Sequence, residues 1–414
     1  MGLKINYYKV YRYLKNKYVL YSFISSLFLI LISYFVNNSP LFTGESMLQY
    51  YGLQKICEKI GIHKTVSYGN AIYYNMSYDK MLVPSVDLLD TIGNNCVSDR
   101  GKLLRFLQLL DSTNRYKYVI VDLLFDKSER SEYDDALYLQ IKKMRNIIIA
   151  DHLEADHAWP EFQESKKSGF VTFFATTVST NFGRMEYSNG SKKSLPLTVY
   201  ENMNPKSTMK KYGFGRLSLY TMGGKLCQNS CFLTFDNNFV KPFKTEKKPD
   251  FYVHSKKFIN LGLFIDNPTR DVVELKELIS INTNNKYVVI GDFVGDVHDT
   301  YMGAIPGSVI MMRALATLEE GGNIVKTSHV MLWLVVFFLI NLSILYNKPI
   351  SKHIPIIKNI PYKLFHFCFS LITFTFVLII VSTIEYICEY PTYSLVVPIF
   401  YFSILKIYVQ YKNQ

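Results

Sequence analysis

The stretch YVVIGDFVGDVHDTYMGAIPG, residues 287–307, places three aspartates, one histidine and four glycines within and after a short apolar run. The run Tyr287–Ile290 contains strand-forming residues without a polar interruption, as expected when helices cover both faces of a strand. The glycines and aspartates predict a loop with tight turns, and Pro306 and Gly307 predict the start of a helix over 306–322. This order of strand, loop and helix is typical of a parallel α/β sheet.

The same order repeats on the amino-terminal side of this stretch. Successive βαβ units are right-handed, so we expect a mostly parallel sheet with helices on both faces. The helix in SDRGKLLRFLQLLD has Ser98 or Asp99 as its N-cap. The segment 152–250 is rich in Ser, Asn, Lys, Tyr and Gly, which predicts an irregular, β-rich insertion. The other expected elements are the helix 44–62, the strand 71–77, the helix 98–111, the strand 116–126, the helix 131–144, the strand 146–151 and the helix 271–280.

Four long apolar runs predict transmembrane helices, because a hydrocarbon core of about 30 Å needs roughly 20 helical residues. These runs cover 18–36, 330–346, 364–384 and 390–405, and the last of them is interrupted by two prolines. The first run is longer than the apolar part of a signal peptide and lacks a small-residue cleavage site after it. We therefore expect an uncleaved anchor.

The charge distribution predicts the orientation of these helices. Of the 46 Lys and Arg residues, eleven lie in 1–17, 347–363 and 406–414, which contain no Asp or Glu. Lys and Arg accumulate on the cytoplasmic side of membrane proteins, so the net charge of +12 indicates a topology and not a nucleic-acid surface. The expected organisation is a cytoplasmic tail 1–17, a transmembrane helix 18–36, an extracytoplasmic domain 37–327, a transmembrane helix 328–346, a cytoplasmic loop 347–363, a transmembrane helix 364–385, an outer turn 386–389, a transmembrane helix 390–411 and a cytoplasmic tail 412–414.

Four of the six cysteines lie in the expected extracytoplasmic domain, where disulfides can form. Cys227 and Cys231 could close a short loop, which would leave Cys57 for Cys96; free buried thiols are the alternative. A zinc site would need two further soft ligands near Cys227 and Cys231, and the sequence does not contain them.

Two acidic loops follow expected strands, and ligands of parallel sheets bind beyond the carboxyl ends of strands. If the strands 116–126 and 287–291 are neighbours, both loops share one rim and could form the wall of a small-ligand pocket. The alternative is that these acids cap turns and the helix start. The sequence contains no EF-hand, phosphate-loop, G-x-S-x-G or H-E-x-x-H pattern, so we expect no metal site, no cofactor and no catalytic residue. The candidate ligand-binding residues are Asp122, Asp126, Asp292, Asp296, His298 and Asp299.

Three motifs resemble the second class of CHASE domains, the sensory extracellular modules associated with cyclases and histidine kinases. They are YVIVDLLFD with SEYDDALYLQI, the closing motif KYVVIGDFVGDVHDTYMGAIPGSVIMMRALATLEEG, and the Arg-bearing helix SDRGKLLRFLQLLD. The layout of one anchor, a large outer domain and three closely spaced spans is similar as well. The resemblance implies a bacterial inner-membrane sensor, but in place of an output domain only KIYVQYKNQ follows the last span. The residues that match the family's motifs are Asp122, Asp126, Asp292, Asp299, Pro306 and Gly307.

These observations predict a multi-pass protein of the cell membrane that detects a small ligand or an envelope signal outside the cytoplasm. It would pass the signal through its helix bundle to a separate cytoplasmic or membrane output protein, and it could act as a homodimer. The alternative is a structural or adaptor protein of the envelope that binds another protein or a glycan. An enzyme would need His298 to be joined by distant histidines such as His152, His157 or His254, and a transporter would need a charge within a span, which we do not identify.

Overall fold

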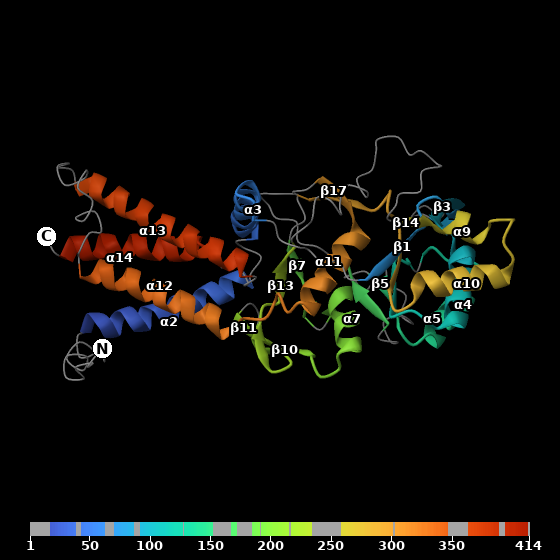
Figure 1. The fold of residues 1–414 in the computed structure, drawn as a ribbon, viewed down its shortest axis with the longest axis horizontal. Coiled ribbons are helices and arrows are strands. Elements are labelled where there is room, and N and C mark those ends of the chain that lie inside the picture. Colours follow the sequence, from blue (N-terminus) through green and yellow to red (C-terminus); the bar gives the residue numbers. More distant parts are fainter. Residues whose placement is uncertain are drawn as a thin grey trace. The chain divides into compact units, whose positions relative to one another are not determined.

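Figure 1 shows the fold of the chain in a computed structural model. The residues that the structure describes are 17–38, 43–62, 70–86, 92–126, 128–151, 167–171, 184–190, 192–214, 217–233, 258–300, 303–346, 363–388 and 394–412. Nearly all of the expected tail 1–17 and loop 347–363, the tail residues 413–414, much of the insertion 152–250, and the histidines His152, His157 and His254 lie outside the described residues.

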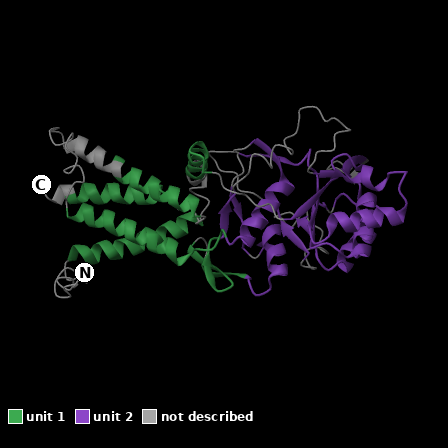
Figure 2. Ribbon diagram, viewed as in Figure 1, with its two compact units in different colours: residues 1–63, 209–228, 322–414 green, residues 64–208, 229–321 purple. Residues whose placement is uncertain are grey.

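The chain forms two compact units, which Figure 2 colours separately. Unit 1 contains residues 1–63, 209–228 and 322–414, and unit 2 contains residues 64–208 and 229–321.

Unit 2 is built on a six-stranded sheet in the order β14-β1-β15-β4-β5-β6, and every neighbouring pair is parallel. The predicted parallel α/β sheet is therefore confirmed. The strands are β1 Ala71–Asn75, β4 Tyr118–Asp122, β5 Ile147–Asp151, β6 Ser168–Phe170, β14 Phe258–Asn260 and β15 Tyr287–Gly291.

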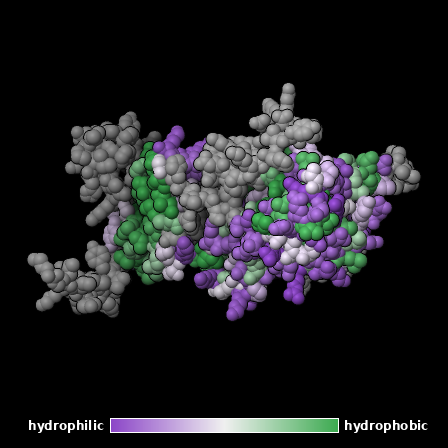
Figure 3. Space-filling model, turned by 45° about the vertical axis from the view of Figure 1, so that its right-hand side comes forward, coloured by the Kyte–Doolittle hydropathy of each residue, from purple (hydrophilic) through white to green (hydrophobic). Residues whose placement is uncertain are grey.

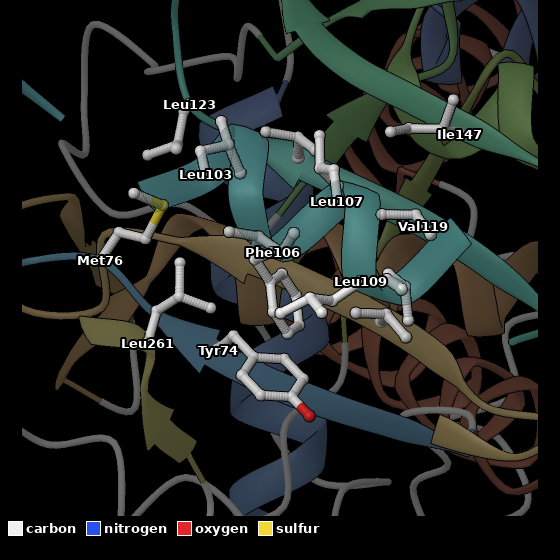
Figure 4. Close-up of a cluster of buried hydrophobic side chains, with 14 of the residues drawn as sticks. Tyr74, Met76, Leu103, Phe106, Leu107, Leu109, Val119, Leu123, Ile147 and Leu261 are labelled. Carbon is white, nitrogen blue, oxygen red and sulfur yellow. The ribbon is translucent and has the colours of Figure 1, made fainter. Parts of the chain in front are cut away.

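Helices cover both faces of this sheet. On one face, α4, α5, α9 and α10 enclose a continuous apolar core with alternate residues of the strands, such as Val119 and Val121. Figure 4 shows Phe106 of α4 beside Tyr74 of β1, with 4.6 Å between the ring centroids. On the other face, the hydroxyl of Tyr118 accepts a hydrogen bond from Asn202 of α7, and that of Tyr287 donates to Glu319 of α11. The helices are α4 Arg100–Thr113, α5 Asp134–Lys143, α7 Leu195–Met203, α9 Leu261–Ile265, α10 Val272–Thr283 and α11 Gly307–Glu319.

The ends of two predicted helices have clear physical causes. Asp99 is the N-cap of α4, since its side chain accepts a hydrogen bond from the backbone N–H of Lys102. At the end of α11, Gly321 adopts a left-handed conformation with φ of 70°, which glycine reaches without steric cost.

Small antiparallel sheets complete both units. Within the insertion, β7 Arg184–Glu186 pairs with β13 Ser230–Phe232, and β8 Ser188–Asn189 pairs with β9 Lys192–Lys193. The hairpin of β2 Lys80–Val86 and β3 Ile92–Ser98, and that of β16 Val297–Thr300 and β17 Gly303–Pro306, were not expected. In unit 1, β10 Met209–Phe214, β11 Leu217–Met222 and β12 Lys225–Cys227 form a three-stranded sheet.

Unit 1 is otherwise helical. It contains α2 Lys17–Asn37, α3 Thr43–Lys59, α12 Thr327–Leu345, α13 Lys363–Ile387 and α14 Val396–Lys412. The helices α2 and α12 are long and apolar enough to cross a membrane, whereas the described apolar parts of α13 and α14, Phe374–Ile387 and Val396–Val409, are shorter.

The interior of these helices is mostly apolar, with buried residues such as Leu29, Phe337 and Phe402, and small polar side chains lie among them. Ser22, Ser26 and Ser33 of α2 are fully buried, and the amide of Asn341 on α12 donates to Ser26 Oγ over 3.0 Å. The outer surface of the helices also exposes apolar side chains, and Figure 3 shows them gathered on the helical part of unit 1. Examples are Leu20, Phe28, Val335, Leu339, Ile372, Phe376, Phe400 and Ile404, each at least 44% exposed.

The predicted disulfides are not formed, because the five described cysteines, Cys57, Cys96, Cys227, Cys231 and Cys388, are free thiols. Cys227 lies in β12 opposite Tyr220, whereas Cys231 lies in β13 opposite Met185, so the two residues belong to different sheets. Burial raises the pKa of the Cys227 thiol to about 12 and that of Cys231 to about 11, which keeps both protonated.

Candidate functional site

The two acidic loops leave the same edge of the sheet. β15 and β4 are adjacent and parallel, and their last residues, Gly291 and Asp122, are paired in register. The condition for a shared rim is therefore met: the loop after β4 carries Asp126, and the loop after β15 carries Asp292 and Asp296.

Four side chains form what we call the rim cluster: Asp122, Asp296, His298 and Ser308. Ser308, the second residue of α11, donates its hydroxyl hydrogen to Oδ2 of buried Asp122 over 2.8 Å. His298 Nε2 lies 3.0 Å from Oδ1 of Asp296. The side chains of His298 and Asp296 are 27% and 42% exposed, so solvent or a small molecule can reach this pair.

Two glycines allow these side chains to approach one another. A Cβ at Gly307 would lie 2.4 Å from Oδ2 of Asp296 and 3.2 Å from Nε2 of His298. A Cβ at Gly291 would lie 2.2 Å from Oγ of Ser308. A Cβ at either position would force the Asp296 carboxylate or the Ser308 hydroxyl to move, so glycine at both positions allows these side chains the places that they occupy.

The rim cluster has unusual protonation behaviour. Burial, reinforced by the negative charge of Asp296, raises the pKa of Asp122 to about 7, although the hydroxyl of Ser308 and the charge of His298 act in the opposite direction. The hydrogen bond with Asp296 raises the pKa of His298 despite partial burial. Asp122 can therefore change its protonation state near neutral pH, and His298 keeps its proton to a higher pH than an ordinary imidazole does.

Asp292 has a different role from the rim cluster. Its Oδ1 accepts hydrogen bonds from Ser77 Oγ over 2.6 Å and from the backbone N–H of Gly295 over 2.5 Å, and its Oδ2 lies 3.0 Å from Lys80 Nζ. Burial would raise the pKa of Asp292, but these hydrogen bonds and the Lys80 charge lower it. The carboxylate is thus satisfied by the protein and holds the loop after β15 in place.

Asp126 lies outside the rim cluster, whereas Asp299 influences it only through its charge, which contributes to the raised pKa of His298. Oδ1 of Asp126 accepts from the backbone N–H and the hydroxyl of Ser128, which forms a local turn. Asp299 lies opposite Ala304 in the β16–β17 hairpin, and its side chain is exposed.

Sequence analysis missed Ser308, Ser77 and Lys80, which hold the acids in position. The only signal for Ser308 was its place directly after Pro306-Gly307, and Lys80 lies in a hairpin that was not predicted. Among the residues described by the structure, no group of three His, Cys, Asp or Glu side chains is arranged to hold a metal ion.

Comparison of the chain with protein-family models, with curated proteins and with solved structures finds no match.

Proposed function

We propose that this protein is a membrane-anchored sensor whose α/β unit responds to a small ligand or an envelope signal at the rim cluster. The observation that carries the proposal is the contact between the rim cluster and the start of α11, which Ser308 makes. Gly307 and Ser308 are the first two residues of α11, and residues 320–326 alone separate this helix from α12, which is long and apolar enough to cross a membrane.

The environment of α11 supports a role in coupling. Every residue from Gly307 to Leu318 is buried, so a displacement at the rim cannot be absorbed by a loose helix surface. In the sequence, α2 precedes the segment that contains the α/β unit and α12 follows it. These two helices pack against each other. A change in the α/β unit would therefore bias the α2–α12 contact, as transmission across a bilayer requires.

We further propose four membrane spans, with the amino terminus, the 347–363 loop and the carboxyl tail in the cytoplasm of a bacterial cell. The exposed apolar surface of the helices and buried hydrogen bonds between them, such as that from Asn341 to Ser26, support placement in a membrane, and the distribution of Lys and Arg supports the orientation. Together with the CHASE-like motifs, the topology favours delivery of the signal to a separate output protein.

A ligand screen on the full chain in detergent or lipid nanodiscs tests the sensor proposal. Thermal unfolding is followed with and without small metabolites, and each stabilising compound is repeated on Asp296→Asn and His298→Gln. The control is Glu277→Gln, which changes an exposed residue of α10. We expect a compound that stabilises the wild type and the control but not the rim variants. Equal stabilisation of all four proteins would contradict a sensory site at the rim, and binding of a protein or glycan instead would favour an envelope adaptor.

A further inference from the structure

The three-stranded sheet of unit 1 has one buried face and one exposed apolar face. Along β11, Ser218, Tyr220 and Met222 are buried. Leu217 and Leu219, which alternate with them, are exposed. Because successive side chains of a strand point to opposite faces, the two leucines share the outer face of the sheet.

The neighbouring strands extend this outer face. Tyr212 of β10 lies opposite Leu219, and Leu226 of β12 lies opposite Thr221. Directly opposite residues of antiparallel strands point to the same side of a sheet. Leu217 is 70% exposed and Tyr212 is 53% exposed. We call Tyr212, Leu217, Leu219 and Leu226 the sheet patch; a contiguous exposed apolar surface of this kind marks a site of contact with a partner or a membrane.

Hydrogen bonds attach this sheet to the ends of both long apolar helices, which belong to the same unit (Figure 2). The hydroxyl of Tyr34, one turn before the end of α2, donates to the carbonyl of Cys227 over 2.7 Å and accepts from the backbone N–H of Tyr220 over 3.0 Å. The backbone N–H of Val325, two residues before α12, donates to the carbonyl of Leu226 over 2.9 Å. The 21 residues of α2 extend over roughly 30 Å, which matches the hydrocarbon core of a bilayer. A sheet held at the end of such a helix would lie at the level of the lipid headgroups.

The charge of the sheet suits an anionic lipid surface. Residues 206–228 contain five Lys and Arg and no Asp or Glu. Lys210, Lys211 and Lys225 are exposed, and Lys210 lies opposite Thr221, on the same face as the sheet patch. Tyrosine and lysine side chains combine an apolar body with a polar end, which places them at membrane–water interfaces. Anionic lipids attract basic segments beside a membrane helix.

We propose that the sheet patch rests on the surface of the lipid bilayer beside α2 and α12. Its leucines would contact the outermost carbons of the acyl chains, and the surrounding lysines would contact anionic headgroups. This placement rests on the proposed membrane topology, and it assigns a lipid-binding surface to a segment expected to lie within the insertion 152–250. Since the sheet is bonded to both helices, the contact would hold the ends of α2 and α12 together at the membrane surface.

Photo-crosslinking in the full chain tests this contact. Benzoylphenylalanine, which inserts into nearby C–H bonds on irradiation, replaces Tyr212 or, separately, Leu219. The protein is placed in nanodiscs of equal amounts of phosphatidylcholine and phosphatidylglycerol, and lipid adducts are identified by intact mass. Leu339 of α12, which is 56% exposed, is the position that reports on the membrane span. Ile281 of α10, which is 64% exposed, is the control in unit 2.

We expect phospholipid adducts at positions 212, 219 and 339 and none at position 281. Adducts at 339 without adducts at 212 and 219 would overturn the lipid contact of the sheet and leave the membrane spans standing. Absence of adducts at all four positions would contradict both. Equal labelling at 281, or crosslinks from 212 and 219 to a second copy of the chain in place of lipid, would also overturn the proposal.

The lipid identity of the adducts tests the role of the lysines. Phosphatidylglycerol adducts should exceed phosphatidylcholine adducts several-fold at position 219, because each Lys beside an anionic surface favours that surface. Replacement of Lys210, Lys211 and Lys225 together by Gln should bring the two yields close to equal. The control Lys142→Gln/Arg145→Gln/Lys276→Gln removes three exposed charges from unit 2 and should keep the excess. Equal yields before any substitution, or an excess that the sheet variant keeps, would refute the contact with anionic headgroups.

Discussion

Replacement of Asp122 by asparagine should remove a specific pH dependence from the stability of unit 2. The pKa of Asp122 is about 7 in the folded protein, compared with an ordinary value of 3.8. The unfolded chain therefore releases this proton at lower pH than the folded chain does, and the stability contribution present below about pH 4 is lost as the pH rises to about 7. A difference of about three pH units corresponds to roughly 4 kcal/mol. The asparagine side chain would keep the hydrogen bond from Ser308 and carry no charge. The variant should therefore not lose this stability as the pH rises.

The measurement compares thermal unfolding of wild type and Asp122→Asn, both as full chains in nanodiscs, between about pH 4 and about pH 8. The difference between their Tm values should grow with pH by on the order of 10 °C, given about 2–4 °C per kcal/mol for a domain of this size. Acids such as Asp292, whose lowered pKa has the opposite effect on stability, contribute equally to both proteins and cancel in the difference. A difference that stays constant, or that shrinks as the pH rises, would refute the assignment of a buried, protonated carboxyl to Asp122.

Three further substitutions test the packing around the proposed sites. Gly307→Ala places a methyl group against Asp296 and should cost about 1–3 kcal/mol in denaturant unfolding, whereas Gly52→Ala, where a Cβ meets nothing within 4 Å, should not destabilise. Arg100→Ala leaves buried Asp134 without its ion-pair partner at 2.6 Å and should cost about 3–5 kcal/mol; a cost below about 1 kcal/mol in the same assay would contradict it. Ser26→Leu should disrupt the α2–α12 contact and lower the Tm in nanodiscs, whereas Leu27→Ile at the exposed surface should not.

The elements of the α/β unit were predictable because their apolar runs are long and their ends carry specific signals. Val119 to Val121 and Val288 to Ile290 identify two buried strands, but nothing in either run states that the strands are neighbours. The order of the strands is determined by the packing of the whole sheet. The acidic loops lie close together only because β4 and β15 are neighbours in that order. The β2–β3 hairpin was missed because a proline lies in one strand and three polar residues lie in the other, which removes the apolar alternation.

Side-chain partners were less predictable than elements. The spacing of Cys227 and Cys231 fits a disulfide loop, yet the assignment of the two residues to different sheets separates their thiols. The expected membrane spans were bounded by the first polar residue at each end of an apolar run. His329 and Glu385 therefore fell at the ends of the expected spans 328–346 and 364–385. The structure also places them near helix ends, since α12 begins at Thr327 and α13 ends at Ile387, and it shows that the two side chains contact each other. Hydropathy along the chain does not reveal such a contact.

Asp122 links the rim cluster to α11, because Ser308 of that helix donates a hydrogen bond to its carboxyl group. Asp122 is buried beneath the first turn of α11, where a proton on its carboxyl and the hydroxyl of Ser308 offset the cost of burial. A ligand that drew His298 away from Asp296 would remove positive charge near Asp122 and favour its protonation. Such a change would alter the contact that fixes the start of α11, while the buried length of the helix prevents local adjustment. In the proposed sensor, the end of α11 and residues 320–326 would be the first part of the chain after the helix to respond to such a change.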